Sequence, residues 1–491
     1  MSRAGPRVQN PSMMNSNIRA SLALVVGLAA SSCAVNPATG NSQIMLISEA
    51  QEIEMGRQAD AAVAQTIGLY ADPVWQRYIQ QFGARLAATS ERPNLPWTFR
   101  VVDDPAVNAF AIPGGFVYVT RGLLAHLTSE AELASVVGHE IGHVTARHTV
   151  AAMSKQQIIG LGLALGSMAN KQVAKYAGTA NEALGILYLK FSRDDESQAD
   201  QLGLRYMRRA GFDPRQMPEV FRMLDRLTTA EGGARVPTWL ETHPSPANRV
   251  AAITQQIAAL PQDFSGTSVN RDSYERLLDG LVFGLNPRQG FFTGSQFSQP
   301  DLRFRLTFPD VWTTNNGAQA VVAVSPQGDA VVELSQAPAA SASAATSAFL
   351  AQQGITSGSS ARVTLTGSLA AVSTPFSAAA DGGALQGTVM FVEYGGAVYG
   401  IVGYAPEARW PAYQAAAERA QRSFQQLTDP AALNVQPHHV DILTLTRSTT
   451  VAQMANERSS PIGAATLALI NQVELQTPFA SGRLMKWVIG L

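Results

Sequence analysis

Three of the seven histidines of the chain lie between positions 139 and 148, and two of them form an H-E-x-x-H segment with Glu140. Residues four apart on a helix lie one above the other, so His139 and His143 can direct both imidazole rings at one ion. Neutral imidazole nitrogens bind Zn²⁺ at about 2.0–2.1 Å. Glu140 lies about 100° further round the helix, where it can accept a proton from a zinc-bound water. The spacing predicts one catalytic zinc ion per chain; the alternative is a surface helix with scattered histidines.

A catalytic zinc ion usually has three protein ligands and a fourth position for water. His148 lies about 900° of helix rotation beyond His139, on the opposite side, so we expect it to be a solvated or structural residue. Glu196 and Asp200, in the segment SRDDESQAD, share one face of a helix. A carboxylate ligand followed by a carboxylate that orients a ligand histidine suits a zinc site. Two neighbouring side chains are acidic alternatives: Asp194 and Asp195.

The elements that must position these residues can also be predicted. Ser129 is a favourable N-cap for the H-E-x-x-H helix, and Glu132 completes the signature of a capping box. Apolar residues at helical spacing predict helices within three other regions: 48–86, 182–209 and 214–227. Segments 97–102 and 115–120 have strand character. The apolar stretch 158–168 is too short to span a membrane, and we expect a core helix or a flap beside the site.

Residues 1–33 have the features of an export signal. Arg19 precedes the apolar run 22–30, which is followed by two serines and Cys33. This run is too short to span a bilayer, which needs about 20 apolar residues. A lone cysteine at this place resembles the bacterial lipobox, although Ala30 stands where Leu is usual, and predicts acylation of Cys33. An ordinary cleaved signal peptide is the alternative.

The chain of 491 residues is too long for one compact core, so several domains are expected. Gly, Pro, Ser and Asn are frequent in 263–300, which predicts a linker. Two Ala-rich helical stretches, 341–352 and 408–427, accompany strand-like segments bounded by turn residues: LRFRLTFPDVW, QAVVAVS, DAVVELS, GTVMFVEY and AVYGIVGYA. They predict a small α+β domain at 301–428. A strand, a helix start and a second strand predict a small module at 437–491. The predicted fold class is therefore multidomain and mostly α+β.

Four motifs follow one another in a fixed order: NAFAIPGGFVYVTRGLL, H-E-x-x-H, SRDDESQAD and ETHPSPANR. Together they resemble the BepA-like and HtpX-like zinc metallopeptidases, which are related to the CaaX prenyl endopeptidase, over about residues 40–262. The resemblance implies a helical gluzincin-type zincin domain with a small edge sheet at 34–262. It implies that Glu196 is the third zinc ligand. It also implies that one segment is the edge strand that receives the substrate backbone: Asn108, Ala109, Phe110 and Ala111.

The same resemblance singles out His243 and Arg249 in THPSPANR. In the BepA-like branch the matching histidine can approach the zinc and block its open position, while the arginine borders the cleft. On physical grounds, either side chain could instead donate a hydrogen bond to a tetrahedral oxyanion. The structural alternative is a rigid His-Pro-Ser-Pro turn with a polar tip.

The C-terminal part departs from that branch, because no helical repeat array follows the peptidase region. Residues 301–428 faintly resemble the PsbP-like α/β fold. The segments VDILTLTRSTTVAQMA and LMKWV faintly resemble a LysM module, which would bind cell-wall glycan.

These observations predict an exported zinc metalloendopeptidase that cleaves misfolded envelope proteins from the periplasmic side, as an outer-membrane lipoprotein. Glu140 is its expected general base. The alternatives are an envelope scaffold or chaperone, and a hydrolase of peptidoglycan amides. A net charge of −1 without a long basic run gives no support for nucleic-acid binding.

Overall fold

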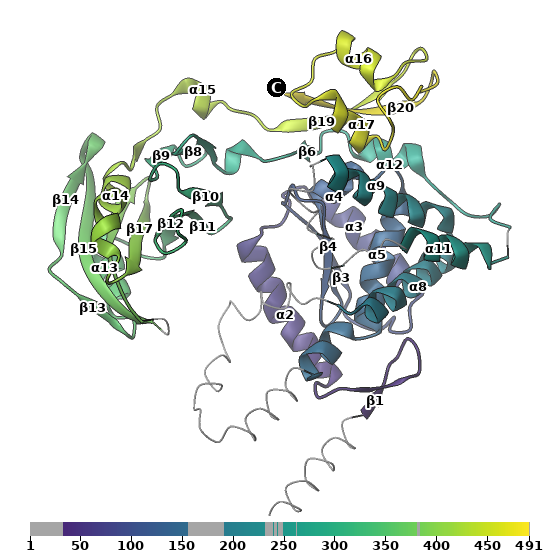
Figure 1. Cartoon of the computed structure of the whole chain (residues 1–491), viewed down its shortest axis with the longest axis horizontal. Coiled ribbons are helices and arrows are strands. Elements are labelled where there is room, and N and C mark those ends of the chain that lie inside the picture. Colours follow the sequence, from purple (N-terminus) through teal and green to yellow (C-terminus); the bar gives the residue numbers. More distant parts are fainter. Residues whose placement is uncertain are drawn as a thin grey trace, which may run out of the picture.

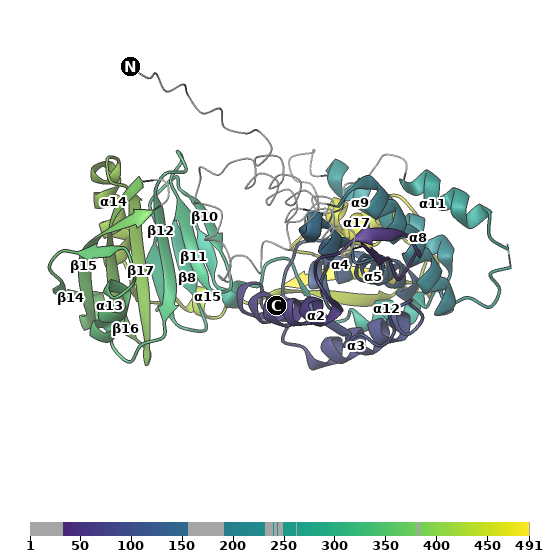
Figure 2. The same ribbon diagram turned by 90° about the horizontal axis from the view of Figure 1, so that it is seen from below.

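The computed structural model describes residues 33–155, 191–230, 239, 243, 249–261, 263–380 and 383–490. A mostly helical body contains the H-E-x-x-H helix, and a β-rich body lies apart from it (Figures 1 and 2). The C-terminal residues form a smaller module that lies on the helical body (Figure 1). The apolar stretch 158–168 and residues 1–32 of the predicted export signal lie outside the described residues.

The helical body is built around one small sheet. Its strands have the order β3-β5-β4, with β3 (Thr98–Val102) parallel and β4 (Ala109–Ile112) antiparallel to β5 (Phe116–Thr120). Strand β4 is therefore at an edge of this sheet. The helices are α2 (Glu49–Thr66), α3 (Pro73–Ala87), α4 (Arg121–His126), α5 (Glu130–Thr145), α8 (Arg193–Arg209), α9 (Met217–Ala230) and α11 (Arg249–Ala258). Both predicted strands and the described parts of the predicted helices are confirmed.

Helix α5 begins where its sequence predicts, but the predicted capping box is only half formed. The Ser129 side chain accepts a hydrogen bond from the Glu132 backbone N–H. The Glu132 carboxylate does not return to the Ser129 backbone; it accepts from the backbone N–H of Thr128 over 2.6 Å and from its hydroxyl over 2.8 Å. Because both bonds come from Thr128, the fully buried Glu132 side chain fixes the turn that precedes the helix instead of the helix end itself.

Small residues allow α5 and α8 to pack in direct backbone contact. A Cβ atom on Gly203 would lie 2.8 Å from the His139 backbone nitrogen. A Cβ atom on Gly142 would lie 3.0 Å from the Ala199 carbonyl oxygen. Because the two helix backbones approach this closely, side chains one turn apart on α8 reach the histidines of α5. The glycine inside the H-E-x-x-H segment therefore has a packing role.

The β-rich body contains two antiparallel sheets. The larger has the strand order β10-β11-β12-β17-β16-β15-β13, with β14 also paired to β15, and the smaller has the order β18-β9-β8-β7. On β16, Val389 and Phe391 pack with helix α13 (Ala342–Leu350), whereas Met390 packs in the core that includes α14 (Trp410–Arg422). Successive side chains of a strand point to opposite faces, so this alternation is expected for a strand whose two faces are both covered. The strand bounds are as follows: β7 (Phe291–Thr293), β8 (Gln296–Gln299), β9 (Phe304–Thr307), β10 (Thr313–Asn316), β11 (Ala320–Val324), β12 (Val331–Ala337), β13 (Ile355–Ser357), β14 (Ala361–Leu365), β15 (Leu369–Ala380), β16 (Gly383–Tyr394), β17 (Ala397–Pro406) and β18 (Gln425–Gln426).

The C-terminal module consists of two helices and a three-stranded sheet with the order β20-β19-β6. Its elements are β19 (His438–Thr444), α16 (Val451–Glu457), α17 (Ala464–Ile470) and β20 (Leu484–Gly490). The third strand, β6 (Val282–Phe283), comes from the segment predicted as a linker, which also contains α12 (Arg271–Leu277) and strands β7 and β8. This segment thus contributes to three parts of the molecule.

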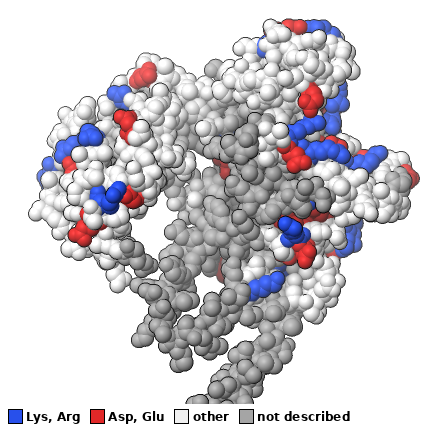
Figure 3. Space-filling model, in the orientation of Figure 1, with Lys and Arg blue, Asp and Glu red and all other residues white. Residues whose placement is uncertain are grey.

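No helix in the described part of the chain is long and apolar enough to cross a membrane. On the face shown in Figure 3, acidic and basic side chains of the described residues are interspersed and form no large patch of one sign. This distribution agrees with the near-zero net charge.

Candidate metal centre

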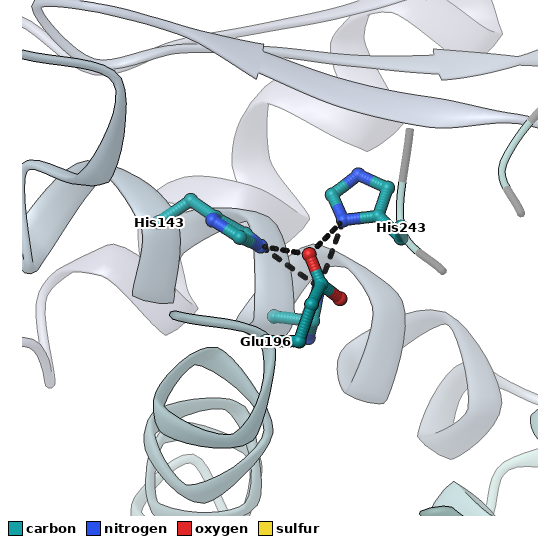
Figure 4. A group of neighbouring side chains, drawn as sticks. His143, Glu196 and His243 are labelled. Atoms are coloured by element: carbon teal, nitrogen blue, oxygen red, sulfur yellow. Dashed lines mark hydrogen bonds and ion pairs between the residues drawn. The ribbon is translucent and has the colours of Figure 1, made fainter. Parts of the chain in front are cut away.

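Four buried side chains from three parts of the chain converge on one point. Ligand atoms of His139, His143, Glu196 and His243 all lie within 4.8 Å of one another. Each of these residues is at most 2% exposed. His143, Glu196 and His243 point toward one another (Figure 4). The structure therefore brings together the two histidines of α5, the predicted carboxylate of α8 and the histidine of the THPSPANR motif.

The spacing of these atoms fits a zinc ion. A tetrahedral zinc ion with bonds near 2.0–2.1 Å would space its ligand atoms about 3.4 Å apart. The two Nε2 atoms of His139 and His143 are 3.0 Å apart. The Glu196 carboxylate oxygens lie 3.6 Å from each of these nitrogens. Two imidazoles and one carboxylate are also a usual donor set for catalytic zinc.

His243 lies where a fourth ligand would bind. Its Nδ1 is 3.0 Å from Glu196 Oε1 and 3.4 Å from His139 Nε2. Its Nε2 is 3.6 Å from Glu140 Oε1. The indole N–H of Trp239 donates to the same Glu140 oxygen over 3.4 Å, and the Trp239 ring stacks on His243. One imidazole thus contacts both the ligand group and the expected general base.

Asp200 and Arg249 form polar contacts with the ligand residues outside the point where the ligand atoms meet. The Asp200 carboxylate lies 2.9 Å from His139 Nδ1, the ring nitrogen that faces away from the cluster. Arg249 donates two hydrogen bonds to Asp200, and its Nη1 lies 3.2 Å from Glu196 Oε2. Arg249 is 4% exposed and also packs over the rings of Phe221 and Trp239. Its guanidinium group is therefore engaged with the two carboxylates.

The protonation states of His143, Glu196 and Asp200 favour metal binding, whereas for His243 burial is outweighed by Glu140 and Glu196, which raise its pKa. Burial lowers the pKa of His143 well below its usual range, and the neighbouring histidines lower it further, so its imidazole is neutral. Burial alone would raise the pKa of Glu196, but the hydrogen bond and charge of His243 and the charges of His139 and Arg249 lower it overall. Burial likewise opposes ionisation of Asp200, yet its hydrogen bond with His139 and the charge of Arg249 lower its pKa. Neutral imidazole and ionised carboxylate are the forms that bind a metal ion.

His148 has the structural role, one of the two that were predicted for it, but it lies beside His143 and not on the opposite side of the helix. Helix α5 ends at Thr145, and Arg147 has a φ of 58°, so the chain turns before position 148. His148 is 4% exposed, and its Nδ1 lies 3.0 Å from Nδ1 of His143. The opposite-side position would hold only for a helix that continued past Thr145 to His148. His148 is still no member of the four-residue group; it is a partner of one of the two histidines in that group.

The predicted substrate strand lies at the sheet edge. Residues 109–112 form β4, and Asn108 immediately precedes it. The Asn108 backbone pairs with Thr120, whereas its buried side-chain Oδ1 has no hydrogen-bond partner. The backbone N–H of Trp239 donates to the carbonyl of Val107 over 3.4 Å. The edge strand and the ligand group are therefore joined through the segment that carries Trp239 and His243.

Residues 73–257 match the model of peptidase family M48. This segment is a peptidase family M48 domain. The match confirms the predicted resemblance to BepA-like zinc metallopeptidases. It includes all four residues of the ligand group, together with Glu140, Asp200 and Arg249.

Relatives of the M48 domain are similar over the same part of the chain. The chain is 35% identical over 225 residues to the "Beta-barrel assembly-enhancing protease" of Escherichia coli (strain K12), which covers 44% of this chain and 45% of that protein. It is 37% identical over 175 residues to the "Mitochondrial metalloendopeptidase OMA1" of Arabidopsis thaliana, which covers 34% of this chain and 33% of that protein. The chain thus matches less than half of the length of either relative.

One solved structure that shows some similarity is the solution structure of cyanobacterial PsbP (CyanoP) from Synechocystis sp. PCC 6803. The sequence identity is 13% and the TM-score is 0.23, with 28% of this chain and 95% of the other covered. A likeness at this level supports no inference about function.

Two residues at the centre were not predicted from the sequence. Trp239, which contacts Glu140, precedes the ETHPSPANR motif, and Gln198, which contacts His148, lies inside SRDDESQAD. For Gln198 a signal was present, because it lies between Glu196 and Asp200 on the same helix. For Trp239 only its closeness to His243 in the sequence could have indicated a role.

Proposed function

We propose that the chain is a zinc-dependent metalloendopeptidase with Glu140 as general base. The observation that carries this proposal is the buried group of His139, His143 and Glu196, with the Glu140 carboxylate one residue along the same helix. A structural histidine cluster would not need a carboxylate at this place. The family match and the names of the relatives support the same reaction class.

Zinc would be held by His139, His143 and Glu196, and it would supply a Lewis acid that lowers the pKa of water and polarises the scissile carbonyl. Asp200 accepts the Nδ1 proton of His139 and so leaves Nε2 of that ring unprotonated toward the ligand group. Arg249 fixes Asp200 and Glu196 in place. We therefore assign Arg249 to ligand positioning.

Glu140 moves the proton. Its carboxylate takes a proton from the attacking water and returns it to the leaving amine, as a general base and then a general acid. The N–H of Trp239 donates to Glu140 Oε1 over 3.4 Å, which holds this oxygen in place. When His243 lies beside the same oxygen, at 3.6 Å, it competes with the attacking water for the base.

The substrate backbone would lie along β4. An edge strand presents unpaired backbone groups to which an extended peptide can add as a further strand. The strand consists of Ala109, Phe110, Ala111 and Ile112, with Asn108 immediately before it. Recognition of backbone instead of side chains suits a protease that acts on unfolded segments.

Misfolded or unassembled envelope proteins are the substrates that we propose. The sequence features of residues 1–33 support export and acylation at Cys33, which would place the enzyme on the periplasmic side of the outer membrane. One relative is named for enhancing β-barrel assembly, which agrees with such substrates. A LysM-like role for residues 437–491 would add peptidoglycan as a binding partner.

Two other functions are the alternatives to a metalloendopeptidase. In an envelope scaffold or chaperone, the M48 domain would bind its clients without cleaving them. In a peptidoglycan hydrolase, the same centre would cleave amides of the cell wall. The complete group of base, ligands and ligand partners favours catalysis over a scaffold role.

The proposal is tested with one preparation and two substrates. We expect the zinc-loaded protein to cleave unfolded casein, to lose this activity on chelation and to regain it with added zinc. Glu140→Gln should abolish cleavage while about one zinc per chain is retained, because the ligands are intact. Casein cleavage by Glu140→Gln at the wild-type rate would contradict the assignment of the base. Release of peptidoglycan fragments without casein cleavage would favour the cell-wall hydrolase.

A further inference from the structure

A continuous series of buried and part-buried hydrogen bonds connects His143 to the N-terminal hairpin of the described chain. Nδ1 of His148 lies 3.0 Å from Nδ1 of His143, and its Nε2 lies 2.9 Å from Gln198 Oε1. Nδ2 of Asn36 lies 3.3 Å from the same Gln198 oxygen. Asn36 directly follows β1 (Cys33–Val35), which pairs with β2 (Ser42–Ile44). The proposed reaction makes no use of His148, Gln198 or Asn36.

Backbone groups fix the orientation of the Asn36 amide at both ends. Its Oδ1 accepts hydrogen bonds from the backbone N–H groups of Ala38 over 2.9 Å and Thr39 over 3.3 Å. Its Nδ2 donates to the carbonyl oxygen of Ala146 over 3.2 Å. A backbone N–H can only donate and a carbonyl can only accept, so the opposite amide orientation would put like groups together. The group that Asn36 presents to Gln198 is therefore a donor.

Asn36 Nδ2 carries two protons and faces three acceptors, which are Ala146 O, Gln43 Oε1 and Gln198 Oε1. When it donates to Gln198, the proton positions follow as far as the metal centre. Because Asn36 presents a donor, the Gln198 atom beside it is the oxygen, which can only accept. His148 must then carry its proton on Nε2, and its Nδ1 is a bare acceptor. The facing Nδ1 of His143 must carry a proton, which leaves Nε2 of His143 unprotonated. That is the nitrogen that lies 3.6 Å from Glu196 Oε1 in the ligand group.

We propose that Asn36, Gln198 and His148 form a relay of positioning residues that holds His143 in its metal-binding tautomer. Asp200 holds His139 in the equivalent tautomer by accepting its Nδ1 proton, as a carboxylate usually does for a ligand histidine. His143 instead depends on His148, whose Nε2 lies 2.9 Å from Gln198 Oε1 and 3.7 Å from the Asp195 carboxylate. This inference rests on the proposed zinc site, and it makes the affinity for zinc depend on the seating of the hairpin that follows Cys33.

The relay predicts a specific effect of two substitutions at one position. Gln198→Leu removes the nearest acceptor of the Nε2 proton of His148 and leaves the more distant Asp195 carboxylate, 3.7 Å away, so the affinity for zinc should fall by up to about 10–100-fold. Gln198→Glu keeps an acceptor at this place, so the affinity should stay at the wild-type value or rise. The matched control is Gln201→Leu, the same change at an exposed position of α8. Zinc affinity is measured by competition with a chromophoric chelator on the full chain.

The tautomers themselves can be observed without any substitution. In zinc-loaded protein labelled with ¹⁵N-histidine, His148 should carry its proton on Nε2, and His143 should carry its proton on Nδ1. The resonances are assigned with His148→Phe. This measurement keeps the inference testable if Gln198→Leu does not fold.

The outcomes separate the relay from the proposed function. Equal zinc affinities of Gln198→Leu and Gln201→Leu, or a proton on Nδ1 of His148, would overturn the relay while the zinc site stands. Failure of the wild-type chain to bind zinc would overturn the proposed function together with the relay. A zinc affinity that falls in Gln198→Leu and is restored in Gln198→Glu supports the relay, whatever the natural substrate is.

Discussion

The side-chain ammonium group of Lys486, on β20, donates a hydrogen bond over 2.8 Å to the carbonyl oxygen of Leu127, just before the H-E-x-x-H helix. The same group donates to the carbonyl of Ala125 over 2.9 Å. Gln472 donates to the carbonyl of His126 over 3.0 Å and to Glu132 over 2.9 Å. Three successive carbonyl groups at the end of α4 are thus satisfied by the C-terminal module. The module therefore completes the peptidase body across 359 residues of sequence.

Lys486→Met should destabilise the protein. Lys486 is fully buried, and its removal leaves two buried carbonyl groups without their donor, at a cost of about 1–3 kcal/mol for each group. The free energy of unfolding is measured by urea denaturation at pH 7. The control is Arg483→Met, at an exposed position of the same module. Equal stability of the two variants would show that Lys486 contributes nothing to the docking of the module.

The stability difference between wild type and Lys486→Met should also depend on pH. Burial lowers the pKa of Lys486 to about 8, although Glu275 and Glu132 nearby act in the opposite direction. An unfolded lysine keeps its proton up to about pH 10.4, so between these values the folded chain holds fewer protons than the unfolded chain. The wild-type advantage should therefore grow as the pH rises from about 8 toward 10. An advantage that stays constant over this range would contradict the lowered pKa.

Gly203→Ala should disturb the metal centre through the helix backbones. The added Cβ atom would lie 2.8 Å from the His139 backbone nitrogen and 3.1 Å from its Cα, and neither atom can move aside alone. Overpacking of this kind costs about 1–3 kcal/mol and separates α8 from α5. We expect a lower unfolding temperature and weaker zinc binding. Gly266→Ala is the control, because its Cβ atom meets nothing within 4 Å; a Gly203 variant as stable as this control would show that the helices can adjust.

The sequence predicted the reactive centre better than its surroundings, for a physical reason. His139, His143 and Glu196 lie on helices whose period places them on defined faces, and this period can be read locally. His148 could not be placed, because the turn at Arg147, with its φ of 58°, changes the direction of the chain. The half-formed capping box had a similar cause: Glu132 bonds to Thr128 and Gln472, and the latter is far away in sequence.

The β-rich part shows another limit of local patterns. Strands rich in Val and Tyr were predicted, whereas β15 was missed because its sequence, LAAVSTPFSAAA, consists mainly of small residues. It is a strand because it pairs with β16, β13 and β14. Such pairing is a property of the sheet and cannot be read from one segment.

Glu196→Ala should release the metal. Its carboxylate lies 3.6 Å from Nε2 of both ligand histidines, whereas Asp200 faces Nδ1 of His139 on the other side of the ring. Removal of the third ligand leaves only two histidines from α5, which do not hold a catalytic zinc ion. The zinc content per chain is measured by mass spectrometry after dialysis. The exposed Asp194→Ala serves as control; if Glu196→Ala retained zinc and activity, another carboxylate would have to be the ligand.

His243 has two candidate roles that predict opposite results. Its Nδ1 lies 3.0 Å from Glu196 and 3.4 Å from His139, and its Nε2 lies 3.6 Å from Glu140. In this position the imidazole would complete a four-ligand zinc site, which is the inert arrangement, and it would also engage the general base. Activity would then require the segment around His243 to move away, and only ligands that prefer the open state could shift that balance.

We expect His243→Ala to raise the basal cleavage of an unfolded substrate, with less discrimination between substrates, because the closed state is lost. As an oxyanion donor, His243 would give the opposite result, a fall of about 10²–10³ in kcat. The kcat and the zinc content of His243→Ala, measured beside those of Glu140→Gln, distinguish the gate from the oxyanion donor. A large loss of turnover with zinc retained would exclude the gate and leave the donor, whereas faster cleavage with zinc retained would establish His243 as the residue that closes the site.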